Sequence, residues 1–160
     1  PEVKDAWTKT YGTVQKVMEP ALVEQMKKLA AQKPASTIDL VRETWALVEQ
    51  DIDNHGVKFF LRIFEIAPPA LQLFSFKDEM PLESSPGMRK HAGGVMRTVG
   101  QAVAGLSDVQ SLIPVLQQLG SRHATYGVQP EHFAIVGQAL LWTLEQGLGS
   151  RWTPEVKDAW

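Results

Sequence analysis

The sequence predicts an all-α protein, and three observations support this fold class. Apolar residues recur at helical spacing along almost the entire chain, and no segment alternates between apolar and polar residues for long. Prolines stand where helices should begin or end, as at Pro68, Pro86 and Pro130. The 160 residues are 44% apolar, which is enough for one domain with a hydrophobic core. We therefore expect at least about six helices.

The first half of the chain contains three predicted helices and one linker. Residues 1–29 keep one apolar face, which predicts a helix. Residues 30–37 (AAQKPAST) have the composition of a linker. A Ser/Thr start signal at the end of this linker precedes a helical stripe that includes Trp45. The next stripe runs from Val57 to Phe64 and should end at Pro68.

The second half contains a loop and three further predicted helices. Residues 75–87 are polar and rich in proline and glycine, which predicts a loop, with Pro86 able to open the next helix. His91 belongs to the apolar stripe of that helix, and His123 ends the stripe of the one that follows. Pro130 should open the last long helix, which continues to the end of an apolar stripe at Leu148.

Composition excludes several classes of partner and site. The formal net charge is −2 with both signs interspersed, so we expect no nucleic-acid partner and no membrane partner. No apolar run reaches the roughly 18 residues of a membrane span, and the first residues lack the apolar core of a signal peptide. The chain has no cysteine, which excludes disulfides and thiolate metal sites and is compatible with a cytoplasmic location.

Two of the four histidines stand out because they lie on apolar stripes. His55 and His132 are next to polar residues, so we expect them at the surface or at helix starts. His91 and His123 lie on stripes of consecutive helices that a short turn separates, so both can face a shared gap. A buried imidazole needs a partner for its nitrogens. The simpler interpretation is two core histidines bonded to backbone or water.

The surroundings favour a metal that brings its own equatorial ligands. The walls of the shared gap would be large and apolar, formed by Phe60, Phe64, Phe74, Val95, Leu119, Phe133 and Leu140. A zinc site needs three or four protein ligands, and no Asp or Glu lies on these stripes. One or two imidazoles in an apolar slot suit haem.

The chain resembles a globin with the three-over-three helical sandwich, and most closely the neuroglobin and plant non-symbiotic haemoglobin branches. The similarity is carried by segments in globin order: LVRETWALVEQ, HGVKFFLRIFEIAPP, LQLFSF, SSPGMRKHAGGV, LGSRHATYGV and HFAIVGQALLWTLEQGLGSRWTPEVKDAW. Each motif alone is weak, but their joint order and spacing are specific. The resemblance covers nearly the whole chain.

The resemblance implies a haem b site with two histidines. His123 takes the place of the proximal iron ligand, with its other N–H held by a backbone carbonyl, and His91 that of the distal histidine. The implied haem-lining residues are Phe60, Phe74, Val95, Leu119, Val128, Phe133, Leu140 and Tyr11. O2, NO and CO are the implied ligands. Because Phe60 replaces a tyrosine of some relatives, His91 would be the single polar contact, and we expect it to bind the iron itself.

The chain departs from the family pattern at Gly94. Relatives often carry a basic residue three positions after the distal histidine, where it meets a haem propionate. Here Lys90 or Arg122 would have to supply that contact, although either could be an ordinary surface charge. The pair Gly93-Gly94 also softens the helix by roughly 1 kcal/mol per glycine relative to alanine. We expect this to ease the movement of His91.

The heptad PEVKDAW occurs twice, at residues 1–7 and 154–160. By resemblance, residues 1–29 correspond to globin helix H, residues 38–153 to helices A to G, and residues 154–160 to the start of a second helix H. Two interpretations stay open: a unit cut from a tandem polyglobin, or an engineered circular permutant. Either copy could complete its own domain or, by domain swapping, that of a neighbour in an oligomer. We expect one copy to be displaced.

Three functions are compatible with these residues. The first is a haem protein that reversibly binds O2. The second is a redox globin that oxidises NO or reduces nitrite, which would need an external electron donor. The third is a helical interaction domain without haem. Whether the chain is an enzyme stays open at this point, and reversible oxygen binding is the function that we expect.

Overall fold

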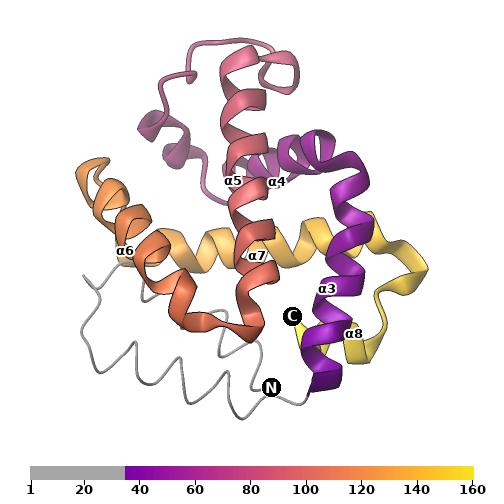
Figure 1. Cartoon of the computed structure of the whole chain (residues 1–160). Helices are drawn as coiled ribbons and strands as arrows, with labels where there is room; N and C mark the ends of the chain where they lie inside the picture. The colour runs from indigo at the N-terminus through magenta and orange to yellow at the C-terminus, as the bar shows by residue number, and fades with distance from the viewer. Residues whose placement is uncertain (1–34) are drawn as a thin grey trace.

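The computed structural model describes residues 35–160, and all of its regular elements are helices (Figure 1). The α-helices are α3 (Ala35–Val48), α4 (Ile52–Ile66), α5 (Pro86–Ala104), α6 (Val109–Thr125), α7 (Pro130–Leu148) and α8 (Pro154–Ala159). Short 3-10 helices lie between them at Glu49–Asp51, Pro68–Leu73, Leu82–Ser84, Gly105–Ser107 and Gly149–Arg151. No strand occurs in this part of the chain, so the predicted all-α class is confirmed.

The helices begin where the sequence provides caps. Ser85 precedes Pro86, and its hydroxyl oxygen accepts a hydrogen bond from the backbone N–H of Met88. At the start of α7, the backbone N–H of Gln129 donates to Nδ1 of His132, and the Gln129 side chain accepts from the His132 backbone. His132 therefore lies at a helix start, as predicted.

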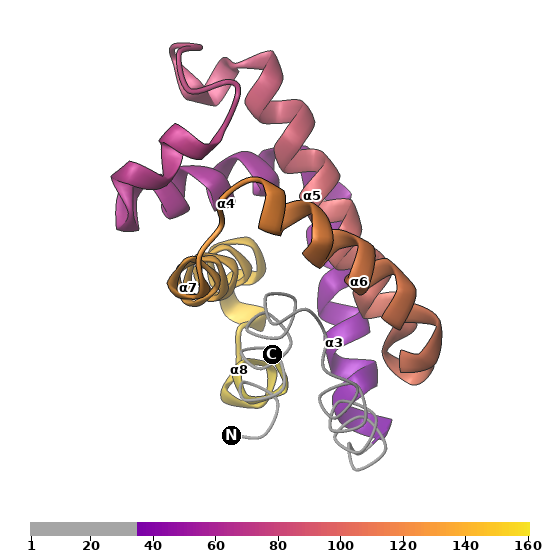
Figure 2. The same ribbon diagram turned by 90° about the vertical axis from the view of Figure 1, so that its left-hand side faces the viewer.

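Helix α4 is central because it packs against both α5 and α7. In Figure 1 α5 crosses in front of α7. Figure 2 shows α7 nearly end-on, with α5 and α6 above it and to its right. The backbones of α4 and α5 meet at Gly56, where an added Cβ would lie 3.1 Å from the carbonyl carbon and oxygen of Ala92. Glycine at this position lets the two helices approach closely.

The side chain of Arg42 on α3 forms hydrogen bonds with the C-terminal end of α5. Nη2 of Arg42 donates to the carbonyl oxygen of Ala104 at 2.7 Å and to the hydroxyl of Ser107 at 2.8 Å. Carbonyls at a helix C-terminus have no partner within the helix, and a cation there interacts favourably with the helix dipole. The corner that leads from α5 to α6 is thereby held against α3.

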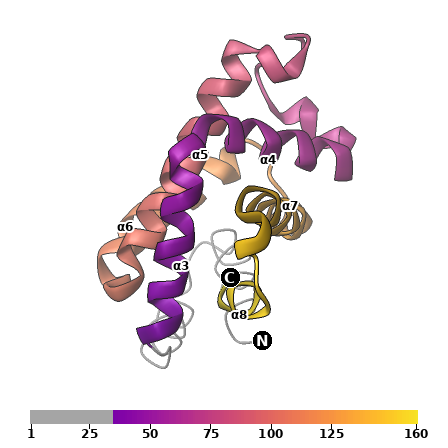
Figure 3. The same ribbon diagram turned by 90° about the vertical axis from the view of Figure 1, so that its right-hand side faces the viewer.

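The C-terminal copy of the heptad forms α8, which packs beside α3 (Figure 3). Its buried residues are Val156, Ala159 and the final Trp160, of which only 1% is exposed. The indole N–H of Trp160 donates to the hydroxyl of Thr44 at 2.8 Å, and its ring lies 5.9 Å from that of Trp45. The N-terminal copy, residues 1–7, lies outside the described residues.

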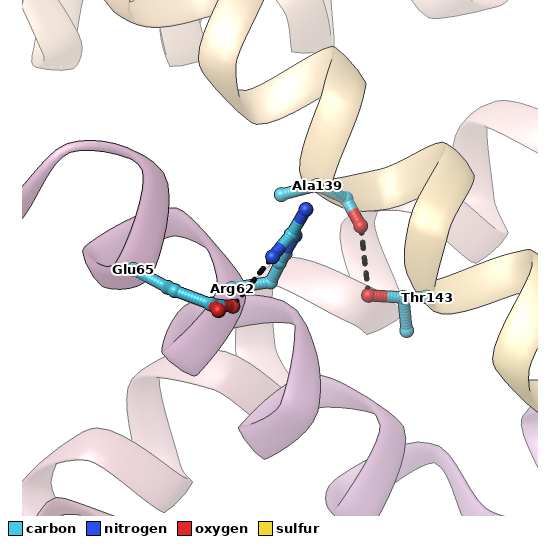
Figure 4. Close-up of polar contacts among 4 residues, drawn as sticks. All are labelled: Arg62, Glu65, Ala139 and Thr143. Carbon is cyan, nitrogen blue, oxygen red and sulfur yellow. Dashed lines mark hydrogen bonds and ion pairs between the residues drawn. The ribbon is translucent and has the colours of Figure 1, made fainter.

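The seam between α4 and α7 contains charged and polar side chains as well as apolar ones (Figure 4). Arg62 pairs with Glu65 at 2.6 Å, and its guanidinium lies 5.2 Å above the ring of Trp142 on α7. Thr143 is fully buried and donates to the carbonyl oxygen of Ala139 at 2.8 Å. The hydroxyl of Thr143 and one terminal nitrogen of Arg62 are thus satisfied within their own helices, whereas Nε of Arg62 is buried without a hydrogen-bond partner among the described residues.

Two boundaries differ from those expected. Helix α3 begins at Ala35, so residues 35–37 of the predicted linker are helical, and the rest of that linker lies outside the described residues. Within the predicted loop 75–87, Phe76 is only 2% exposed, and a 3-10 helix forms at Leu82–Ser84. Within the described part of the chain, no helix combines the length and the hydropathy that a membrane crossing requires.

Candidate functional site

His123 is held in one tautomer by its own helix. It lies near the end of α6, is half-buried, and its Nδ1 is 2.8 Å from the carbonyl oxygen of Leu119, one turn earlier. Because a carbonyl oxygen only accepts hydrogen bonds, Nδ1 carries the proton of the neutral ring. Nε2 is then the nitrogen with the free lone pair, which is the arrangement that a metal-binding histidine requires.

A small apolar cluster surrounds His123. The ring of Phe133, from α7, lies 6.3 Å away, and that of Tyr126 lies 6.2 Å away in an edge-on orientation. Phe133 and Leu116 form the buried part of this cluster, against which Leu112 and Val128 pack. His123 therefore stands on an apolar patch built from α6 and the start of α7.

His91, in the second turn of α5, is in contact with three phenylalanine rings. The ring centroids of Phe60, Phe74 and Phe76 lie 5.2, 5.3 and 5.9 Å from its own. The sequence pattern predicted a buried position, and this prediction is wrong, because His91 is exposed in the structure. His91 thus has one side against aromatic rings and another side that is accessible.

The surroundings of His91 affect the protonation of its ring. Desolvation of the ring lowers the pKa of His91 below its ordinary value of 6.5, and the charge of His123 lowers it further. Both effects favour the neutral imidazole. At neutral pH His91 therefore has a lone pair available either to bind a metal or to accept a hydrogen bond.

The other predicted lining residues fall into two groups. Phe60 and Leu140 are buried in the main core, while Phe74 and Val95 are half-buried against it. Phe133 and Val128 belong to the separate cluster around His123, and Leu119 is half-buried and contributes its carbonyl. Tyr11 lies outside the described residues. The ring of His91 thus contacts phenylalanines of the main core, whereas His123 lies beside the separate cluster on α6 and α7.

Sequence reasoning missed Phe76. It is buried, stacks on Phe74 with ring centroids 5.1 Å apart, and contacts His91. Its place within a polar, proline-rich stretch hid it, because such composition predicts an exposed loop. The available signal was the pair of phenylalanines two positions apart in LFSF, an apolar spacing that a solvated loop does not need.

The residues fit haem better than a metal ion bound by protein ligands alone. Within residues 35–160, no three His, Cys, Asp or Glu side chains gather into a group that could hold a metal. Two imidazoles, each beside aromatic or aliphatic side chains, match the donor set and the apolar walls that haem requires. The carbonyl bond of His123 is the outer-shell contact that fixes a ligand's tautomer.

Comparison with known proteins agrees with this geometry. A family model described as Globin matches residues 57–160, which include most of α4, all of α5 to α8, and both His91 and His123. The chain belongs to the globin family. The match extends through the C-terminal copy of the heptad, so α8 lies inside the globin region of the chain.

Plant proteins are among the relatives of this globin. The anaerobic nitrite reductase GLB0 of Physcomitrium patens is 33% identical over 156 residues, which cover 89% of this chain and 87% of the relative. The anaerobic nitrite reductases AHB2 of Arabidopsis thaliana and NSHB5 of Oryza sativa subsp. indica are each 39% identical. Their matches cover 76% of this chain and 80% and 81% of their own lengths. The resemblance to plant haemoglobins is thus reproduced in these matches.

The residues considered for the haem propionates are at the surface of this globin. Lys90 and Arg122 are both exposed. Gly94 is exposed too, and a Cβ added there would meet no atom within 4 Å, so α5 has room for a side chain at this position. In contrast, a Cβ at the buried Gly93 would lie 2.6 Å from a carboxylate oxygen of Asp53.

His55 lies at a helix start, one of the two positions predicted for it, but it is not fully exposed. It lies in the first turn of α4, as expected for a helix start, but it is half-buried, and its ring occupies the space beside Gly147 of α7. Its Nδ1 is buried and has no hydrogen-bond partner within residues 35–160. Burial and then the charge of Lys58 lower the pKa of His55, against a smaller opposing effect of Asp51.

This environment predicts that acid destabilises the globin through His55. The folded state favours the neutral ring, so its contribution is present above the ordinary pKa of 6.5 and is lost as the pH falls through the lower folded pKa. We expect the free energy of unfolding, measured by urea titration, to fall less steeply below about pH 6.5 in His55→Gln. Identical pH slopes for both proteins would contradict this.

Proposed function

We propose that this globin binds haem b between His123 and His91 and that it reversibly binds O2 and other diatomic gases. The hydrogen bond from Nδ1 of His123 to the Leu119 carbonyl carries the proposal, since it directs the free lone pair of Nε2 away from the helix backbone. His91, whose ring lies against Phe60 and Phe74, supports the proposal as a second imidazole beside apolar side chains. When bound, haem would be held by His123 and would supply an iron atom that can bind a gas or a second imidazole.

The residues of the chain have distinct roles in this proposal. His123 supplies the axial nitrogen, and the Leu119 carbonyl fixes its tautomer and raises its basicity. The phenylalanines around His91 exclude water, and none of them can donate a hydrogen bond to a ligand. His91 is then the polar group available on that side, either as a donor through a ring N–H or as a ligand through its lone pair.

We further propose that His91 binds the iron in the ferrous protein without gas. Its lowered pKa keeps it neutral at pH 7, and only the neutral imidazole can be a ligand. Phe60, 5.2 Å from the His91 ring, offers no hydrogen bond that would hold the ring away from the iron. An incoming gas would therefore have to displace His91.

His91→Ala is expected to retain haem but to become five-coordinate. Alanine removes the second imidazole and leaves His123 with its carbonyl bond unchanged. The absorption spectrum of the ferrous protein without gas should change from the six-coordinate to the five-coordinate form. CO binding should become faster by about tenfold or more, because CO no longer has to displace His91. A tenfold change in rate corresponds to about 1.4 kcal/mol of activation free energy. Gln101→Ala, an exposed change on the same helix, serves as the control.

Unchanged spectra in His91→Ala would contradict the proposed role of His91. A colourless unsubstituted chain that takes up no haem on titration would instead contradict the proposed function as a whole and favour a helical interaction domain without haem.

Nitrite reduction is a second candidate, favoured by the names of the three plant relatives. Converting nitrite to NO and water takes up one electron and two protons, so an external electron donor is required. His91 could supply a proton, because its lowered pKa makes its protonated form a stronger acid than an ordinary imidazolium. Anaerobic NO release from nitrite and a chemical reductant, compared with His91→Ala, measures this activity. Nitrite consumption no faster than with free haem would exclude it.

We also propose that residues 1–29 form globin helix H and that residues 154–160 are the start of a second copy of it, so that the two copies compete for one place. The opening turns are represented by α8, whose Val156, Ala159 and Trp160 are buried. Residues 1–7 have the same sequence as residues 154–160. They are followed by TKTYGTVQKVM, in which apolar residues keep a helical spacing. This helix could complete its own domain or that of a neighbour, as in a tandem polyglobin, a permutant or a swapped oligomer. Light scattering over a range of concentrations would separate an intramolecular from a swapped arrangement.

A further inference from the structure

Glu79 lies outside the site described above, yet it is bonded to the start of the helix that carries His91. Its carboxylate oxygen Oε2 accepts two hydrogen bonds. One comes from the hydroxyl of Ser85 at 2.6 Å and the other from the backbone N–H of Gly87 at 3.0 Å. The first N–H groups of a helix have no partner within the helix, and an anion is favoured there. Glu79 therefore attaches the preceding loop to the first turn of α5.

The same loop segment brings Phe76 onto α5. An added Cβ at Gly87 would lie 2.8 Å from Cβ of Phe76 and 2.6 Å from a carboxylate oxygen of Glu79. No side chain fits between the loop and the helix at this position without a shift. The backbone N–H of Glu79 also donates to the carbonyl oxygen of Phe76 at 2.9 Å, which makes residues 76–79 one turn.

This turn lies directly beside His91. Gly87 and His91 are four residues apart on α5, so they share one face of the helix. Phe76 contacts the His91 ring and stacks on Phe74, which contacts it as well. Within residues 35–160 the ring contacts of His91 are with Phe60, Phe74 and Phe76, and two of these three come from the loop that Glu79 holds.

We propose that Glu79 is a positioning residue for His91: by attaching residues 76–79 to Ser85 and Gly87, it holds the phenylalanines that orient the distal imidazole. The inference rests on the proposed function, because it concerns how readily His91 leaves the iron. With the carboxylate in place, the His91 ring is kept against the rings of Phe74 and Phe76. Without it, the loop moves more freely and the ring is less restrained.

Glu79→Gln tests this proposal, with Glu83→Gln as the matched control. The glutamine keeps the size of the side chain but loses the charge-assisted bonds, which are stronger than neutral ones. Glu83 is an exposed glutamate in the same loop, and its substitution removes the same charge. Glu79 is exposed as well, so neither change should prevent folding.

Two measurements on the full chain are needed. Amide hydrogen exchange at Gly87 reports the attachment itself and should be about tenfold faster in Glu79→Gln. The rate at which CO displaces His91 in the haem-loaded protein reports the effect on the distal ring and should rise by about three- to tenfold. Glu83→Gln should change neither rate.

Each outcome is decisive. Unchanged exchange at Gly87 would overturn the attachment. Faster exchange with an unchanged rate of CO displacement would show an attachment that does not orient His91, which also overturns the proposal. A chain that binds no haem would refute the proposed function instead, and this result is recognised from the spectrum of the unsubstituted protein before any variant is compared.

Discussion

His123→Ala is expected to lose stable haem binding. The substitution removes the one imidazole whose Nδ1 is bonded to a carbonyl and whose Nε2 is free for iron. Loss of an outer-shell partner alone typically weakens a metal site by about 10- to 100-fold, so loss of the ligand itself should exceed about 100-fold. Haem affinity can be measured by titrating haem into the haem-free chain and following the Soret absorbance, or by haem transfer to a competing apoprotein.

Gln118→Ala is a suitable control for this variant. Gln118 is exposed on the same helix and lies one residue before Leu119, so the change perturbs α6 without altering the carbonyl bond of His123. If His123→Ala kept haem with the affinity of Gln118→Ala, His123 would not be the axial ligand. Imidazole added to His123→Ala should restore part of the binding, which a general loss of folding would not allow.

Trp160→Ala should cause the largest loss of stability among single changes at the C-terminal helix. The side chain is buried, packs against Trp45 and donates a hydrogen bond to Thr44. Truncating a buried tryptophan to alanine costs about 3–5 kcal/mol. The free energy of unfolding, measured by urea titration with fluorescence detection, should fall by this amount.

The repeated heptad gives this experiment a second use. Trp7 has the same place in residues 1–7 that Trp160 has in residues 154–160. A loss below about 1 kcal/mol in Trp160→Ala would contradict the expectation that α8 depends on this residue, since a buried tryptophan normally contributes more. The double variant with Trp7→Ala would then show whether the first copy substitutes for the second. Trp152→Ala, a change at a half-buried tryptophan outside the heptad, provides the comparison.

The sequence predicted the helices well because their signals are local. Pro86 and Pro130 open α5 and α7, and apolar residues at helical spacing mark the faces that pack. His91 and His123 were identified because histidines on apolar stripes are unusual and because their surroundings resemble a known family. The family is confirmed by comparison, whereas haem binding and the role of each residue stay predictions.

What could not be predicted depends on contacts between distant segments. The burial of His55 follows from Gly147, a residue of another helix that leaves space for an imidazole ring. Phe76 and Glu79 lie in a stretch whose composition predicts a loop, and their roles arise only when that stretch folds back onto α5. Periodicity describes one element at a time, so such tertiary contacts leave no signal in it.

The side chain at position 56 can set the distance between α4 and α5, although Gly56 is not itself a residue of the candidate site. Because α4 and α5 meet there at van der Waals contact, a methyl group 3.1 Å from the Ala92 backbone would press the two helices apart by a few tenths of an ångström. His91 is next to Ala92 and would move with its helix, while His123 on α6 would not be pushed directly. A substitution on α4 could thus change the position of α5, and with it that of His91, while both histidines and their aromatic neighbours stay the same residues.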